Sequence, residues 1–133
     1  MVDASVTLSW CFAEEQTPLS LIVLDRLNAG EAACRPGFSV AGNSQFFTRR
    51  GENGTNLARS NAFVLRDIGA LHLTLDHESF EQVSGPVQTL CRDHRITPYD
   101  ALYIELAIRL QCPLATLDRL QQKAAKELGV GCL

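Results

Sequence analysis

The chain is 133 residues long, with 46% hydrophobic residues, 20% charged residues and a formal net charge of −3. This length predicts a single domain, residues 1–133, built around one core. The mild acidity excludes a strongly basic protein that coats phosphates over its whole surface, but it leaves room for an enzyme that grips nucleic acid locally.

The N-terminal part is predicted to contain two helices and a strand. An apolar run over residues 6–12 directly follows D-A-S at 3–5 and predicts a short helix. Pro18 suits the first turn of a second helix, which N-A-G at 28–30 ends. A weak buried strand is expected over residues 32–34.

The central part has the least regular pattern. Residues 38–56 show no clean hydrophobic period, and their glycines and asparagines favour loops. A helix is expected over 57–68, and the alternating L-H-L-T-L at 71–75 predicts a strand that ends at Asp76. Four arginines in this part could form either a phosphate-facing patch or a solvated helix face: Arg49, Arg50, Arg59 and Arg66.

The C-terminal part is predicted to alternate helices with short strands. A helix over 78–94 has a weak point at G-P (85–86), and the next helix begins at T-P (97–98), where Thr97 can cap and Pro98 suits the first position. Short apolar strands alternating with helices indicate an α/β fold with a parallel sheet and right-handed crossovers. The remaining expected elements are a strand at 113–116, a helix at 118–128 and a final strand at 130–133.

Three aspartates stand at junctions between a predicted strand and a predicted helix or in the first turn of a helix. They are Asp3, Asp100 and Asp118. In a parallel sheet such positions gather at the carboxyl ends of the strands, where clustered carboxylates repel one another unless a cation lies among them. Oxygen-only ligation suits Mg²⁺ or Mn²⁺. The alternative is that the aspartates only serve helix starts. Asp3 and Asp118 would then be caps, and Asp100 would be a capping-box acid paired with Thr97. Under the metal interpretation, Ser5 and Thr116 would orient a water molecule or a phosphate oxygen.

Other polar and aromatic residues receive simpler interpretations. Five cysteines without a C-x-x-C pair predict buried free thiols and a cytoplasmic protein. No signal peptide or membrane span is expected. Trp10 and Tyr103 are expected in the core. Glu105 lies about 140° around the helix from Asp100 and is expected to be solvated rather than catalytic.

The order of the acidic motifs resembles that of PIN-domain ribonucleases, and of VapC-type toxins most closely. The resemblance is carried by D-A-S-V-T-L-S-W-C-F at the start, by T-P-Y-D-A-L-Y-I-E-L-A-I-R-L from residue 97, and by P-L-A-T-L-D from residue 113. It covers the start of the chain and residues 90–130 almost throughout.

The resemblance implies a three-layer α/β/α sandwich with a short central parallel sheet. It also implies an endoribonuclease that depends on Mg²⁺ or Mn²⁺, leaves a 5′-phosphate and a 3′-hydroxyl, and uses Asp3, Asp100 and Asp118 as metal ligands. As the toxin of a type II toxin–antitoxin pair, such a protein would form homodimers and bind a cognate antitoxin. A second interpretation is a receiver-like phosphate enzyme, but such an enzyme would need a lysine near the last strand, whereas Lys123 and Lys126 fall in the last predicted helix.

The chain departs from the family pattern in two places. Only Met1 and Val2 precede the first acid, so we expect either a short central strand or a start codon further upstream. Family members also carry a glutamate in a helix that reads roughly W-x-L-E-x-A-N, whereas Gly42 occupies that slot here. If Gly42 is genuine, the alternative function is a catalytically impaired PIN-like module that still dimerises and binds an antitoxin.

We predict that this second departure reflects a shifted reading frame. Residues 39–48 can be encoded as AGT GTG GCT GGA AAT AGC CAA TTC TTT ACN, and the frame one nucleotide on reads V-W-L-E-I-A-N-S-L. The glutamate then falls at the slot of Gly42, and a compensating shift before Leu57 restores the pattern. Sequencing the genomic locus tests the idea, which is wrong if other codons encode this stretch.

Overall fold

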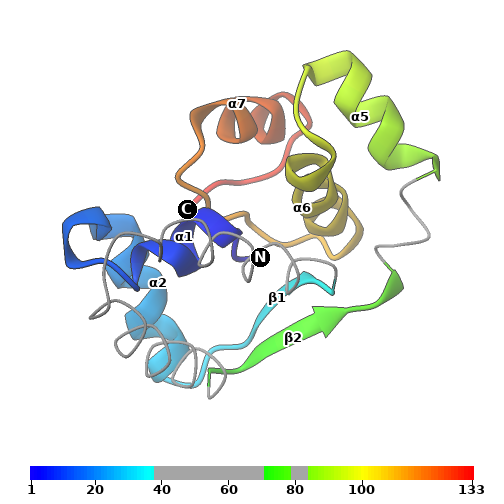
Figure 1. Cartoon of the computed structure of the whole chain (residues 1–133). Helices are drawn as coiled ribbons and strands as arrows, with labels where there is room; N and C mark the ends of the chain where they lie inside the picture. Colours follow the sequence, from blue (N-terminus) through cyan, green and yellow to red (C-terminus); the bar gives the residue numbers. More distant parts are fainter. Residues whose placement is uncertain (38–70, 79–83) are drawn as a thin grey trace, which may run out of the picture.

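The computed structural model describes residues 1–37, 71–78 and 84–133 (Figure 1). The predicted helix at 57–68, the four central arginines and the Gly42 segment lie outside the described residues. Within the described parts the protein is a mixed helix-and-strand structure whose sheet is parallel, as the sequence predicts. No helix in these parts is long and apolar enough to cross a membrane.

Capping side chains determine where the N-terminal helices begin. Helix α1 (Ala4–Ser9) begins directly after Asp3, which caps it, and is followed by a 3₁₀ turn, η1 (Ala13–Glu15). Helix α2 (Pro18–Asn28) begins at the predicted proline, and a reciprocal capping box between Thr17 and Ser20 satisfies its first N–H groups. The apolar run predicted as a helix at 6–12 is therefore helical only as far as Ser9, and its helix starts two residues earlier because Asp3 caps it.

A two-stranded parallel sheet forms where strands were expected. Strand β1 (Ala33–Pro36) pairs with β2 (Leu73–Asp76), with Ala33 opposite Leu73 and Pro36 opposite Asp76. At the end of β1 the Gly37 N–H donates to the Asp76 carbonyl over 2.8 Å, and a Cβ on Gly37 would lie 3.0 Å from that oxygen. A side chain at this close backbone approach would crowd the Asp76 carbonyl, which favours glycine.

Single hydrogen-bonded positions extend the sheet. The Val2 N–H donates to the Cys34 carbonyl over 3.2 Å, and parallel bridges link Val2 to Ala115 and Leu114 to Cys132. From edge to edge, the paired segments run β2, β1, Val2, residues 114–115 and Cys132. The strands predicted at 113–116 and 130–133 are thus reduced to bridges. Between Val2 and Ala4, where α1 begins, there is little chain to form a ladder.

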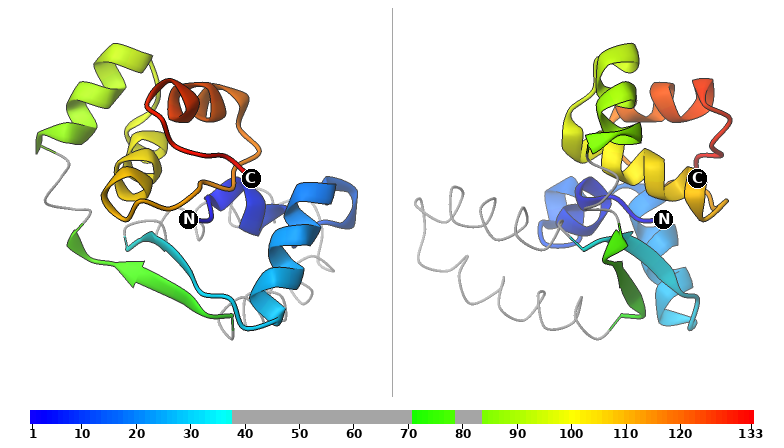
Figure 2. Two further views of the ribbon diagram at one scale, coloured as in Figure 1. Left: turned by 180° about the vertical axis from the view of Figure 1, so that it is seen from behind. Right: turned by 90° about the vertical axis from the view of Figure 1, so that its right-hand side faces the viewer.

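Three helices complete the C-terminal part: α5 (Pro86–His94), α6 (Pro98–Arg109) and α7 (Arg119–Glu127). The predicted helix at 78–94 is present only from Pro86 within the described residues, because Gly85 takes a non-helical conformation at the cap and proline suits the first helical position. Thr97 caps α6 and Asp118 caps α7, as predicted. In all views α5, α6 and α7 gather on one side of the N-terminal segment and α2 lies on the other (Figures 1 and 2).

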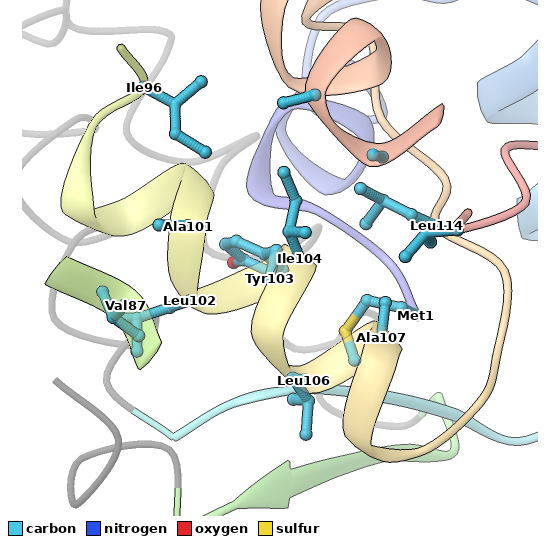
Figure 3. Packing of buried hydrophobic residues seen from close by; sticks show 13 residues of the cluster. Met1, Val87, Ile96, Ala101, Leu102, Tyr103, Ile104, Leu106, Ala107 and Leu114 are labelled. Carbon is cyan, nitrogen blue, oxygen red and sulfur yellow. The ribbon is translucent and has the colours of Figure 1, made fainter. Parts of the chain in front are cut away.

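The largest group of buried apolar side chains surrounds α6. Residues 101–107 of this helix are all buried, and Met1 and Leu114 belong to the same cluster (Figure 3). A second cluster joins α1 and α2 through Val6, Trp10 and Val23. The prediction that Trp10 and Tyr103 belong to the core is confirmed. The cysteines are all free, as predicted, but are only half-buried: Cys11, Cys34, Cys91, Cys112 and Cys132.

The prediction that Glu105 is solvated is wrong. Glu105 is only 7% exposed and sits within the buried run of α6. Its charge is tolerated because Arg109, one helical turn later, donates to Glu105 Oε1 over 2.9 Å and also binds Asp76 over 2.7 Å. Hydrogen bonds to Asp76, then to Glu105, raise the pKa of the Arg109 guanidinium. Arg109 thereby links α6 to the end of β2.

Arg109→Met should destabilise the fold by roughly 3 kcal/mol, because it leaves the buried carboxylate of Glu105 without its cation. Urea unfolding measures the loss. Lys123→Met is the matched control, because its exposed pair with Glu127, at 3.9 Å, should contribute less than about 0.5 kcal/mol. Equal effects of the two substitutions would show that the Arg109 network is not structural.

Candidate functional site

The carboxylate of Asp3 is buried, with 6% of the residue exposed. Its Oδ2 accepts hydrogen bonds from the Ser5 backbone N–H at 2.9 Å, the Ser5 hydroxyl at 2.5 Å and the Thr116 hydroxyl at 3.2 Å. A buried carboxylate is tolerated only when donors replace the water it loses. Asp3 is therefore fixed in orientation by two hydroxyl groups from opposite ends of the chain.

The same two hydroxyls also reach the segment that carries Asp118. The Leu117 N–H donates to Ser5 Oγ over 3.0 Å, and the Asp118 N–H donates to Thr116 Oγ1 over 3.1 Å. Each hydroxyl thus accepts from the backbone at 117–118 and donates to Asp3. Ser5 and Thr116, predicted to orient water or phosphate, are in this structure engaged with the Asp3 carboxylate.

Asp118 and Asp100 both lie at helix starts. Asp118 Oδ1 accepts from the Leu120 and Gln121 N–H groups over 2.7 and 3.0 Å. Asp100 Oδ2 accepts from the Thr97 hydroxyl over 2.7 Å, and that hydroxyl oxygen accepts from the Asp100 N–H over 3.2 Å. The helix-capping interpretation is therefore confirmed for Asp118 and also for Asp3, which caps α1 through the Ser5 N–H, and Asp100 joins Thr97 in the cap of α6.

Each of the three acids uses only one carboxylate oxygen in these bonds. Within the described parts of the chain, Oδ1 of Asp3, Oδ1 of Asp100 and Oδ2 of Asp118 accept no hydrogen bond. Capping and ligation would therefore not compete for the same oxygen.

The three acids share one electrostatic environment. The pKa of Asp100 is raised, mainly because burial penalises its charged form, while the hydrogen bond from Thr97 opposes the shift. The negative charges of Asp3 and Asp118 raise this pKa further. The charges of Asp3 and Asp118 therefore act on Asp100, although these residues are 97 and 18 positions away from it in sequence.

Asp3 and Asp118 lie where the chain changes direction across the sheet, on either side of the Val2 segment. From Val2 the chain continues to β1 and β2 on one side, and it returns at residues 114–115 on the other side of Val2. Open α/β sheets bind their ligands outside the carboxyl ends of the strands at such a switch point. Asp3 directly follows Val2, and Asp118 follows the 114–115 segment, so both acids lie beside this position.

The carboxylates do not form a ready-made coordination shell. Among the described residues, no three of His, Cys, Asp and Glu are arranged to hold a metal ion. The donor chemistry nevertheless fits a hard divalent cation: three carboxylates with an available oxygen each and an excess of negative charge. The arrangement can attract a cation, and ligation would require those oxygens to turn toward a shared point.

Thr97, which the sequence pairs with Asp100 at the start of a helix, donates its hydroxyl to the Asp100 carboxylate. One contributor to the site was missed in the sequence. The N–H of Gln121 binds Asp118, and its side-chain amide donates to the Asp100 carbonyl over 3.2 Å. The spacing D-x-x-Q from residue 118 places Gln121 at the third helical position, which the capping-box pattern could have indicated.

Neither a protein-family model nor a curated protein matches the chain. The acidic motifs and the geometry around them are therefore what a functional assignment rests on.

Asp100→Asn should raise the thermal midpoint of the metal-free protein at pH 7. The pKa of Asp100 is raised on folding, so the folded protein prefers the protonated carboxyl. The contribution of Asp100 to the free energy of unfolding is therefore fully present below the pKa of the unfolded chain, about 3.9, and is lost as the pH rises through the pKa of the folded protein. Asparagine is neutral throughout and can still accept from Thr97. Thermal melts in EDTA at pH 7 and pH 3.5 measure the effect, which should vanish at the lower pH.

Asp93→Asn is the control, because Asp93 is exposed on α5 and should leave both midpoints unchanged. An Asp100→Asn protein that melts below the wild type at pH 7 would contradict the proposed repulsion among the acids.

Proposed function

We propose that the protein is a Mg²⁺- or Mn²⁺-dependent endoribonuclease of the PIN-domain class, acting as the VapC-type toxin of a toxin–antitoxin pair. One observation carries the proposal: hydrogen bonds tie together the segments of all three acids. The Thr116 hydroxyl donates to Asp3 and accepts from the Asp118 N–H, and Gln121 bonds to both Asp118 and the Asp100 carbonyl. The order of the paired segments and the place of two acids at its reversal support the three-layer α/β/α sandwich that we assign to the fold.

In the proposed mechanism, Asp3, Asp100 and Asp118 would hold the metal through the carboxylate oxygens that accept no hydrogen bond in the caps. A bound Mg²⁺ or Mn²⁺ ion would supply an activated water and neutralise the scissile phosphate. Ser5 and Thr116 keep the Asp3 carboxylate in place through their hydroxyls, a role for which the observed bonds give direct support. Thr97 does the same for Asp100.

The remaining assignments follow from the proposed class. They are RNA as substrate, a homodimer, a cognate antitoxin as partner, and the cytoplasm as location. The last of these is supported by five cysteines that are all free, since a reducing compartment keeps thiols in this state.

A catalytically impaired binding module is the second candidate. It is favoured by Gly42, which stands where the family pattern has an acid. Such a module would lack enough carboxylates to retain a metal, yet it would still dimerise and bind an antitoxin. Metal binding by the unmodified chain therefore separates the two candidates.

Asp100→Asn should reduce Mn²⁺-dependent cleavage of a mixed-sequence RNA by more than about 100-fold, because it removes a metal ligand rather than an outer-shell partner. Asp93→Asn is the matched control and should cleave like the wild type. Full activity of Asp100→Asn would refute the assignment. A wild type that binds no Mn²⁺ at millimolar concentration in calorimetry would favour the binding module instead.

A further inference from the structure

Gln121 contacts two of the three acidic residues. It lies in the first turn of α7 and is 0% exposed. Its backbone N–H donates to Asp118 Oδ1 over 3.0 Å, and its side-chain Nε2 donates to the backbone carbonyl of Asp100 over 3.2 Å. One buried residue therefore joins the start of α7 to the start of α6.

Packing alone does not explain a glutamine here. Burying an amide is costly unless both of its ends are hydrogen-bonded. Within the described residues, Oε1 of Gln121 is buried without a hydrogen-bond partner, so the amide is only half satisfied. A methionine would fill similar space without an unpaired acceptor. What the glutamine provides is the Nε2 donor to Asp100, because a backbone carbonyl can be bound only by a donor.

The next residue in α7 acts in the same way on the other side of the site. Gln122 Nε2 donates to the Thr116 carbonyl over 2.7 Å, and the hydroxyl of Thr116 donates to Asp3. Asp118 is itself the cap of α7. The start of this one helix is thus bonded to the segments that carry all three acids.

We propose that Gln121 is a positioning residue that fixes the separation of Asp100 and Asp118 and thereby sets the affinity of the acid cluster for a divalent cation. The inference rests on the proposed metal site. Gln121 does not touch the cation. It acts through the backbone of Asp100, so its removal lets the start of α6 move relative to α7 while all three carboxylates remain.

Mn²⁺ titration of Gln121→Met, followed by electron paramagnetic resonance, tests this role without depending on enzymatic activity. The Kd for Mn²⁺ should rise about 10- to 100-fold, the range found when outer-shell partners of metal ligands are removed. Ser20→Ala is the control: Ser20 is also 0% exposed, but its hydroxyl bonds to Thr17 at the start of α2. It should lower the thermal midpoint and leave the Kd within about twofold of the wild type.

The outcomes separate this inference from the proposed function. A wild type that binds Mn²⁺ and a Gln121→Met protein that binds it equally well would overturn the positioning role and leave the nuclease proposal intact. A wild type that binds no Mn²⁺ would overturn both. If Gln121→Met loses its cooperative melt, Gln121→Asn replaces it, because asparagine keeps an amide but is one methylene too short to reach the Asp100 carbonyl.

Discussion

The buried carboxylate of Asp3 ties the N-terminal segment to the C-terminal acid segment. It follows a segment that pairs with both β1 and residues 114–115, so it lies at the junction of the two halves of the chain. A negative charge in this position must be hydrogen-bonded, and its donors come from Ser5 and from Thr116, 113 residues away in sequence. Satisfying this one group holds the C-terminal acid segment against the N-terminal one.

Helix starts make the remaining negative charges tolerable. Asp100 and Asp118 lie in the first turn of α6 and at the cap of α7, where exposed N–H groups and the helix dipole favour a carboxylate. Burial and mutual repulsion act in the opposite direction, and at Asp100 they prevail, because its pKa is raised. The cation that we propose for this site would neutralise these charges.

The parts of the fold that local chemistry determines were predictable from the sequence. Thr97 with Pro98, and Pro18 after Thr17, identify the starts of α6 and α2 because caps and first-turn prolines need only their neighbours. The alternation at 71–75 likewise identifies β2. Of the helix predicted at 78–94, the described residues show α5 from Pro86 to His94. Gly85 and Pro86 form its start signal, whereas the sequence pattern had suggested only a weak point inside a longer helix.

What could not be predicted depends on contacts between distant residues. Helical spacing correctly placed Glu105 on a different side of α6 from Asp100, but it could not show that this side faces the core or that Arg109 and Asp76 would form a paired network there. The three aspartates could be proposed from their junction positions. The donors that orient them could not, since Ser5 and Thr116 meet only when Val2 pairs with Ala115.

The site therefore has two layers with different physical requirements. The acids can remain charged near one another only if their repulsion and burial destabilise the fold little. The residues that orient them need complete hydrogen bonding to hold that arrangement. Ser5, Thr97 and Thr116 meet the second requirement with hydroxyls that accept from the backbone and donate to a carboxylate. Gln121 meets it only partly, since its Oε1 is left without a hydrogen bond among the described residues. An apolar side chain at position 121 would avoid the cost of this unpaired oxygen. We therefore explain the glutamine by its Nε2 donor, which connects the segments of Asp100 and Asp118.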